Sequence, residues 1–278
     1  MSDTPPIDIA ALCAPLGEAA PCGENLEYDP LFLALEEAAS GKPEVQYGST
    51  ITPATPPDWQ QVRRLALELM ERSRDLRLAV ALTRALLGLH GARGLADGLG
   101  LLAELLARHW DGVHPQLDAD DDHDPTARVN VLAALCQPGG LLRDLRQAPL
   151  ARVRALGSVS LRDIELAAGD GEAAPGQEKI SAAVIDAVFA ETDHAELAAT
   201  AAALDAAVAD THRIEQLLTE HVGVGGALDL APLAVLLRRA GDVLRPHLGG
   251  AAAAEADGDN ASDGGPAGQG AGRPPARE

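Results

Sequence analysis

The sequence predicts an all-α fold, with a multi-helix N-terminal domain, a second helical hairpin region and a disordered C-terminal tail. Aromatic residues make up only 2% of the 278 residues, so the core has to be built from Leu, Ala and Val. Such side chains favour packed helices, whereas a β-sandwich or barrel needs more β-branched and aromatic residues. Capping residues, glycines and prolines also recur at intervals that suit helices.

Six helices are expected before residue 150. Asp29 and Pro30 supply an N-cap and a first helical position, Asp58 can cap the second helix, and Ser73 or Asp75 can begin the third. Asp124 and Pro125 are expected to cap the fifth helix, and a Pro-rich loop at 42–57 separates the first two. The expected ranges are 30–40, 59–72, 75 to 88 or 91, 94–111, 125–136 and 141–147.

The hydrophobic pattern of the sequence changes after residue 150. Residues 153–159 nearly alternate, so an extended segment is possible there, and Ser160 can cap a short helix. Small and polar residues at 169–176 predict a linker. Helices are then expected at 178–190, 193–222 and 230–248, with a turn at 223–226; the middle helix would be about 45 Å long.

These patterns divide the chain into four parts. Residues 15–150 form the first helical domain, 151–176 a connecting segment and linker, and 177–248 an antiparallel helical hairpin. Residues 249–278 are mostly Gly, Ala, Pro and Asp without large apolar side chains. Such a segment buries too little surface to offset its conformational entropy, so it is expected to be disordered.

The charge of the chain excludes several classes of partner. The formal net charge is −20, which repels phosphate backbones and anionic lipid, so binding to nucleic acid or insertion into a membrane is not expected. Three cysteines without a CxxC pair do not suggest a disulfide framework or a zinc ribbon. The first residues are acidic and lack a basic region, so a signal peptide is not expected and the predicted location is cytoplasmic.

The acidic run from Asp118 to Asp124 is the strongest candidate for a metal site. Its first, third and fifth positions are carboxylates, as in a calcium loop, but His123 replaces the Gly at the sixth position and Val129 the Glu at the twelfth. We therefore interpret it as a solvated loop before a helix. No catalytic, cofactor-binding or metal-binding residue is predicted.

The remaining candidate residues each have a structural interpretation and a functional one. His109 and His114 lie five residues apart at the end of a helix, which does not match a zinc motif and suits helix C-terminal histidines. Cys22 lies in a turn and is either a packed cysteine or a reactive thiol. Trp59 and Trp110 are expected to pack in the core, with a hot spot for a partner as the alternative.

Seven short motifs, in order, resemble the ImpA/TssA N-terminal family of bacterial type VI secretion systems. Together they cover residues from about 15 to 168, and the hairpin to 248 is similar to the middle region of the family. The motifs are PCGENLEYDPLF (21–32), DWQQV (58–62), ERSRDLR (71–77), GLADGL (94–99), WDGVHPQLD (110–118), LLRDL (141–145) and SLRDIE (160–165).

The resemblance implies a cytoplasmic, non-enzymatic assembly protein that contacts baseplate, tube and sheath proteins and initiates or caps the contractile tail. Family members commonly end in a further helical domain that drives ring assembly, and nothing beyond Leu248 suits packing, so at most a weak homodimer is expected. The alternatives are a metal-dependent or small-molecule enzyme that uses the acidic run, and a helical adaptor unrelated to secretion. The candidate interaction or structural residues are Cys22, Gly23, Glu24, Tyr28, Asp29, Trp59, Asp75, Trp110 and His114.

Overall fold

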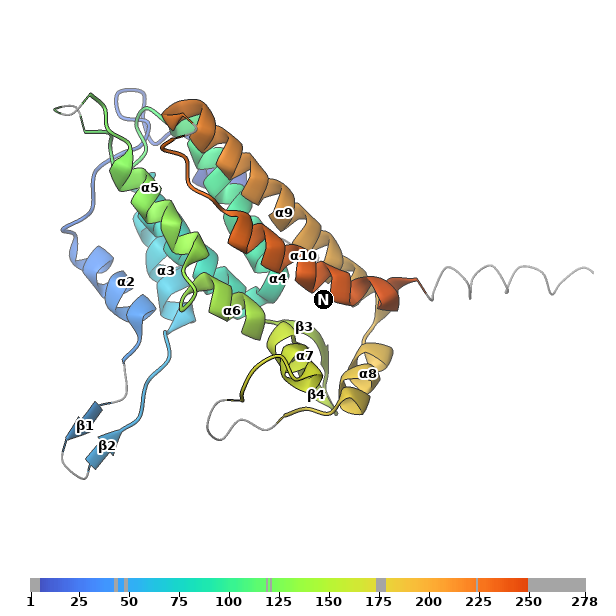
Figure 1. Ribbon diagram of the computed structural model, residues 1–278. Coiled ribbons are helices and arrows are strands. Elements are labelled where there is room, and N and C mark those ends of the chain that lie inside the picture. The colour runs from blue at the N-terminus through green and yellow to red at the C-terminus, as the bar shows by residue number, and fades with distance from the viewer. Residues whose placement is uncertain are drawn as a thin grey trace, which may run out of the picture.

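Helices dominate the structure, as predicted. The computed structural model describes residues 6–42, 45–47, 50–118, 120, 122–173, 179–223 and 225–249. Figure 1 shows the arrangement. The helices are α1 (Ile9–Leu12), α2 (Pro30–Ser40), α3 (Trp59–Met70), α4 (Leu76–His109), α5 (Thr126–Ala133), η1 (Ala134–Cys136, a 3-10 turn), α6 (Leu141–Gln147), α7 (Leu161–Ala168), α8 (Ala182–Glu191), α9 (His194–Val222) and α10 (Ala231–Leu248).

Helix α4 reverses its direction in the middle. Gly91 has φ 63° and ψ −144°, a conformation that glycine adopts far more readily than other residues, and the chain folds back there. The two halves then pack so closely that a Cβ atom on Gly98 would lie 2.6 Å from the hydroxyl oxygen of Thr83. The predicted break at Gly88 or Gly91 is therefore confirmed.

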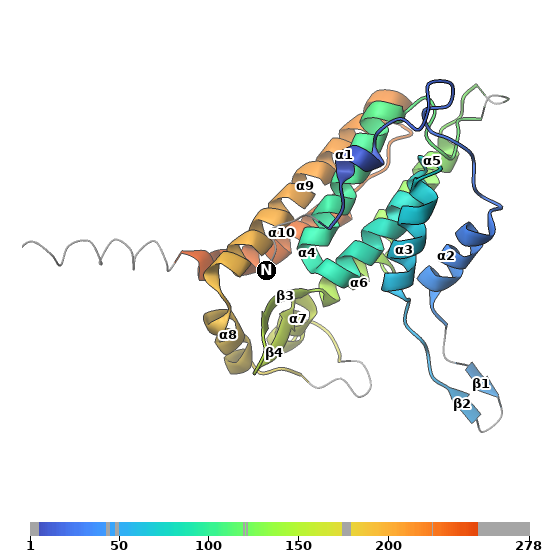
Figure 2. The same ribbon diagram turned by 180° about the vertical axis from the view of Figure 1, so that it is seen from behind.

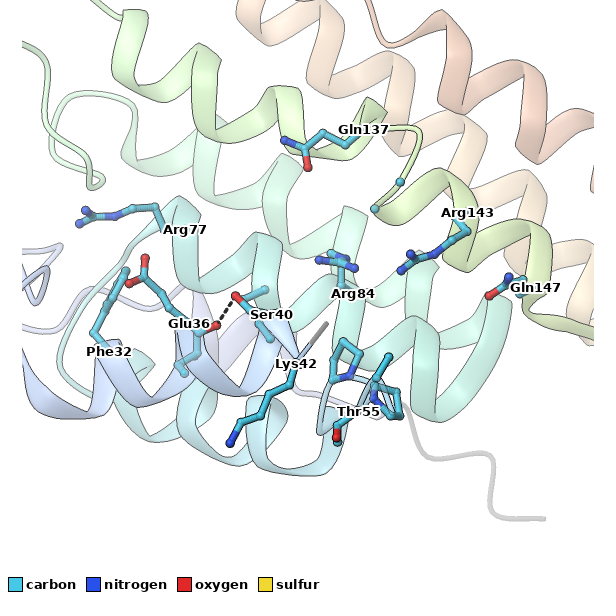
Figure 3. A pocket seen from close by; sticks show the side chains of 18 residues that line it. Phe32, Glu36, Ser40, Lys42, Thr55, Arg77, Arg84, Gln137, Arg143 and Gln147 are labelled. Atoms are coloured by element: carbon cyan, nitrogen blue, oxygen red, sulfur yellow. Dashed lines mark hydrogen bonds between the residues drawn. The ribbon is translucent and has the colours of Figure 1, made fainter. Parts of the chain in front are cut away.

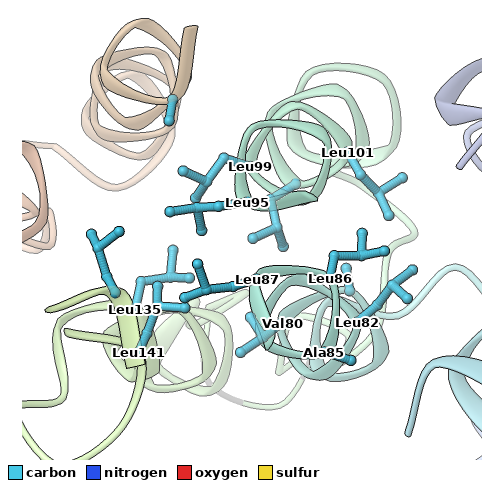
Figure 4. Close-up of a cluster of buried hydrophobic side chains, with 14 of the residues drawn as sticks. Val80, Leu82, Ala85, Leu86, Leu87, Leu95, Leu99, Leu101, Leu135 and Leu141 are labelled. Atoms are coloured by element: carbon cyan, nitrogen blue, oxygen red, sulfur yellow. The ribbon is translucent and has the colours of Figure 1, made fainter. Parts of the chain in front are cut away.

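Leucines fill the space between the two halves of α4. Figure 4 shows Leu86 and Leu87 of the first half facing Leu95 and Leu99 of the second half. These four side chains are at most 2% exposed. Because burying a leucine stabilises a fold by about 1.5–3 kcal/mol, this seam is a principal source of stability.

The long hairpin α9–α10 packs against α4. Helix α9 makes its most extensive contacts with α4 and the next most extensive with α10, and Figure 2 shows it lying along both. Leu204 and Leu218 of α9 are fully buried and belong to the same hydrophobic cluster as α4. The predicted division into 15–150, 151–176 and 177–248 stays a prediction, and in the structure both helical parts share one core.

Two antiparallel hairpins correct the expectation of a purely α-helical chain. Strands β1 (Val45–Tyr47) and β2 (Thr50–Thr52) pair between α2 and α3, where a Pro-rich loop was expected. Strands β3 (Pro149–Val153) and β4 (Gly157–Ser160) pair beside α7 and α8. The extended segment expected at 153–159 contains the turn of this second hairpin. The β-branched residues in these strands suit extended backbone.

The predicted caps mostly hold. The side chains of Asp29, Asp58 and Asp75 each accept a hydrogen bond from an amide of the first turn that follows. Ser160 forms a capping box with Asp163. The expectation for Asp124 was wrong: α5 begins after Pro125, and no side chain of the described residues caps it.

Some expectations fall outside the described positions. Residues 250–278 of the tail and 174–176 of the linker are among them, so their predicted disorder stays a prediction. The helix expected at 178–190 begins at Ala182, with Ser181 as its N-cap. Within the described ranges, no helix combines the length and apolar character that crossing a membrane requires.

Candidate functional site

The segment 72–75, which joins α3 to α4, holds two loops that are distant in sequence. The amide of Arg74 donates to the carbonyl oxygen of Cys22 at 2.8 Å, and the carbonyl oxygen of Arg74 accepts from the amide of His114 at 2.9 Å. Asp75 forms an isolated β-bridge with His114. We call this meeting of residues 22–24, 72–75 and 113–115 the junction. It contains five of the nine predicted residues, Cys22, Gly23, Glu24, Asp75 and His114, and a sixth, Asp29, pairs with its Arg72.

Gly23 makes the junction possible. Its φ is 69°, and a Cβ atom there would lie 2.8 Å from the Cδ1 atom of Leu16. The Nε2 atom of His114 lies 3.3 Å from the carbonyl oxygen of Gly23, so the imidazole sits against the backbone. Burial raises the pKa of the Cys22 thiol, which opposes the reactive thiolate considered for this residue. The side chains of Cys22 and His114 are both buried in the junction.

The carboxylates of the junction are used to cap helices and pair arginines. Asp75 is fully buried, accepts from the amide of Arg77 at 2.8 Å, and pairs with the guanidinium of that residue at 2.7 Å. Asp29 accepts from the amide of Leu31 at 2.9 Å and pairs with Arg72 at 2.8 Å. These two contacts, the amide first, lower the pKa of Asp29.

Two buried arginines complete the junction, and the sequence analysis missed their role. Arg74 donates to the carbonyl oxygen of Ala14 at 2.7 Å and also bonds the carbonyl of Met70. Arg128 donates to the carbonyls of Pro115 and Val113, both at 2.8 Å, and to that of Trp110. Burial lowers the pKa of both guanidiniums, that of Arg128 to about 10.

A sequence signal for Arg128 existed. It precedes Val131, Leu132 and Leu135 by three, four and seven residues, which is the spacing of one helix face. An arginine on an apolar face has to place its five N–H donors on acceptors inside the fold. In the structure those acceptors are backbone carbonyls, and no described carboxylate forms an ion pair with Arg128.

The two tryptophans lie away from each other and are partly buried. The ring of Trp110 stacks on that of His221, with centroids 4.1 Å apart, and so joins the end of α4 to α9. The guanidinium of Arg128 lies 4.9 Å from the centre of the Trp110 ring. Trp59 packs at the start of α3, and the guanidinium carbon of Arg84 lies 5.1 Å from the centre of its ring. Both contacts suit the expected packing role.

One predicted residue points outward. Tyr28, just before the N-cap of α2, is 86% exposed, and Leu33 in the first turn of α2 is 54% exposed. Glu24, Glu27 and Glu37 are exposed around them. We call Tyr28 and Leu33 the α2 tip. Tyrosine is enriched at protein–protein interfaces and among the residues that contribute most to their binding energy.

The acidic run forms a turn closed by its own backbone. The amide of Asp118 donates to the carbonyl oxygen of Asp124 at 3.2 Å, and the amide of Asp120 donates to the carboxylate of Asp118 at 3.0 Å. The carboxylate of Asp124 accepts from the hydroxyl of Thr126. Among residues with a described position, no group of three His, Cys, Asp or Glu side chains is arranged to hold a metal ion.

An open groove of about 1070 Å³ lies between α2, α4 and the segment from η1 to α6. Figure 3 shows Arg84 of α4 and Arg143 of α6 in its middle, with Lys42 at one side. The rest of the lining mixes apolar residues, among them Ala39 and Pro56, with polar ones, among them Glu36 and Gln137. None of the nine predicted site residues lines this groove.

Comparisons with known proteins agree with the motifs. The family described as ImpA, N-terminal, type VI secretion system matches residues 13–137. The type VI secretion system component TssA1 of Pseudomonas aeruginosa is 48% identical over 235 residues, which are 84% of this chain and 67% of that protein. The N-terminal domain, including the conserved ImpA_N region, of the TssA component from Burkholderia cenocepacia superposes with a TM-score of 0.70 and 29% identity over 87% of this chain and 94% of that one. The chain therefore belongs to the TssA family of type VI secretion system components.

Proposed function

We propose that the chain is a non-enzymatic assembly protein on the cytoplasmic side of a type VI secretion system, where it contacts baseplate, sheath and tube proteins and helps to initiate or cap the contractile tail. The observation that carries this proposal is the identity of 48% with TssA1 over 84% of the chain. A scaffold acts through its surfaces, so its partners should bind exposed side chains.

The positions and contacts of the motif residues support a scaffold function. The junction places Cys22, Asp75 and His114 inside the fold, where they bond backbone groups and Arg77. Tyr28 belongs to the same motif, yet its ring is exposed and makes no ring contact with the described residues. We assign Tyr28 and Leu33, the α2 tip, as a contact point for a secretion-system protein, because exposed aromatic anchors dominate binding energy at interfaces.

The enzymatic alternative has less support. A catalytic site needs polar groups that converge from separate elements around a space for substrate. In the acidic run, the carboxylate of Asp118 instead accepts from the amide of Asp120, and that of Asp124 from the hydroxyl of Thr126. No observation on the described residues favours this reading over the scaffold.

A binding assay with purified proteins tests the proposal. The chain is immobilised and exposed in turn to the sheath, tube and baseplate proteins encoded by the same bacterium, and we expect saturable binding of at least one. Tyr28→Ala with Leu33→Ala should weaken that binding about tenfold and leave the unfolding midpoint unchanged.

The matched control is Leu156→Ala, which removes an exposed leucine in the turn between β3 and β4. It should bind as the native chain does. Absence of binding to every one of these proteins would refute the scaffold proposal. An equal loss in the control would refute the assignment of the α2 tip alone.

A further inference from the structure

Arginines outnumber carboxylates around α6. Asp144 pairs with Arg84 at 2.7 Å and with Arg143 at 2.9 Å, so two guanidiniums that line the groove share one carboxylate. Figure 3 shows these two arginines side by side. One positive charge in this cluster therefore remains without a compensating carboxylate.

The same excess continues next to the groove. A second hollow of about 230 Å³ shares Arg143 and Gln147 with the first, so the two are adjacent. Its buried Glu165 lies 3.2 Å from a guanidinium nitrogen of Arg239, 3.8 Å from one of Arg146 and 3.9 Å from one of Arg162. Asp170 also pairs with Arg239, at 3.5 Å.

This positive strip is unusual in a chain of net charge −20. Five arginines, Arg84, Arg143, Arg146, Arg162 and Arg239, meet three carboxylates there, Asp144, Glu165 and Asp170. A fourth carboxylate, that of Glu36, lines the groove on the side of α2, so the arginines still outnumber the carboxylates. Arg143 and Arg239 are about half exposed, and Lys42 stands exposed at the side of the groove. A strip whose sign opposes that of the whole molecule selects and steers ligands of negative charge.

The lining of the groove favours a peptide over a nucleic acid. Ala39, Pro56 and Pro57 are at least partly exposed and present apolar surface in the groove beside the cationic groups. A polypeptide that alternates acidic and small apolar side chains complements such a mixture, since its carboxylates reach the arginines and its apolar groups cover the alanine and prolines. A polyphosphate backbone gains nothing from this apolar surface.

We propose that the groove and the adjacent hollow along α6 bind an extended acidic segment of a partner protein, with its carboxylates at Arg143, Arg146 and Lys42. The inference rests on the proposed function in that the partner is expected within the secretion system. It adds a second binding surface, because the α2 tip and α6 present different side chains.

The test measures fluorescence anisotropy of a labelled peptide of alternating glutamate and alanine, titrated with the full chain. We expect binding that weakens as salt is added, and no binding of the matching peptide of glutamine and alanine. Arg143→Glu with Arg146→Glu should weaken binding about tenfold or more, because attraction becomes repulsion at two positions. If this pair lowers the unfolding midpoint, Arg143→Ala with Arg146→Ala replaces it and should weaken binding in the same direction.

The matched control is Arg152→Glu with Arg154→Glu. Both arginines are exposed at the hairpin of β3 and β4, outside the two hollows, and neither side chain forms an ion pair or hydrogen bond with a described residue. The control makes the same change in net charge and should keep most of the affinity. An equal loss in both variants, no effect of the groove variant, or no binding of the acidic peptide to the native chain would overturn the proposal. Tighter binding to an oligothymidine or to phosphatidylglycerol vesicles would also overturn it.

Capture of secretion-system proteins separates this inference from the proposed function. If the native chain and the groove variant both capture sheath, tube or baseplate proteins with equal affinity, the function stands and the groove assignment fails. If the native chain captures none of them while the acidic peptide still binds the groove, the scaffold proposal fails by itself.

Discussion

Removing the buried guanidinium of Arg128 should destabilise the fold strongly. The side chain is fully buried and donates to the carbonyl oxygens of Trp110, Val113 and Pro115. In Arg128→Ala these three carbonyls lose their donor, at about 2 kcal/mol each. Burial lowers the pKa of the guanidinium from 12.5 to about 10, which corresponds to a desolvation cost of roughly 3 kcal/mol at 1.36 kcal/mol per pKa unit. Removing the guanidinium also removes this cost. A net loss of about 3 kcal/mol remains.

Urea unfolding followed by tryptophan fluorescence measures this loss, since Trp110 stands directly under the guanidinium. Arg128→Met keeps a long side chain but removes its N–H donors, so it should lower the free energy of unfolding by a similar amount. The exposed Arg152→Ala is the control and should change stability by less than about 0.5 kcal/mol. A loss below about 1 kcal/mol in both Arg128 variants would show that water reaches the three carbonyls and that the arginine does not hold the loop.

Four further outcomes are expected. Asp97→Asn should raise the free energy of unfolding at pH 7 by about 1 kcal/mol, because burial raises the pKa of Asp97 and one of its oxygens lacks a partner among the described residues. Ionisation of Asp97 destabilises the native fold as pH rises from 3.8 through its raised pKa. The stabilisation by Asp97→Asn should therefore vanish in urea titrations below pH 3.8, and a stabilisation that persists there would show that the raised pKa is not its cause. Gly91→Ala should cost about 1–3 kcal/mol from its left-handed backbone alone, whereas Gly241→Ala inside α10, where a Cβ meets open space, should not destabilise; equal effects would contradict this. Thermal unfolding should be the same in calcium and in chelator, and a stabilisation above about 2.7 kcal/mol at hundredfold excess of the ion over its dissociation constant would show a real site in the acidic run. Light scattering at micromolar concentration should give a monomer or dimer, because Leu204 and Leu218 of α9 are already buried within the chain; a ring of about ten subunits would contradict this.

Local signals explain what the sequence predicted well. The caps at Asp29, Asp58, Asp75 and Ser160 each depend on bonds within three residues, so a single stretch of sequence contains all the information. The reversal at Gly91 was likewise visible as a cluster of glycines between two apolar patterns. The breaks and starts of helices were therefore predictable to within a few residues.

Contacts between distant residues explain what was missed. The junction joins positions near 22, 74 and 114, and no periodicity links segments that lie 40 or more residues apart along the chain. The groove likewise collects Arg84 and Arg143 from two helices that only the folded chain brings together. The hairpin β1–β2 was hidden because prolines on its flanks dominate that stretch of sequence. Tertiary packing determines these features, and the helix and strand propensities of neighbouring residues do not encode it.

The junction also determines how force passes through the molecule. The segment that carries the α2 tip is bonded to the peptide of Arg74, and so is the loop at His114 that follows α4. The nearby Trp110 stacks on His221 of α9, so the C-terminal hairpin is attached to the same loop. Tension applied to a partner bound at Tyr28 therefore reaches α9 through a short chain of hydrogen bonds and one ring stack, across the end of the bundle rather than along its helices. A load on this connection is carried by the hydrogen bonds at Arg74 and by the stack of Trp110 on His221, in addition to the packing of α9 on α4.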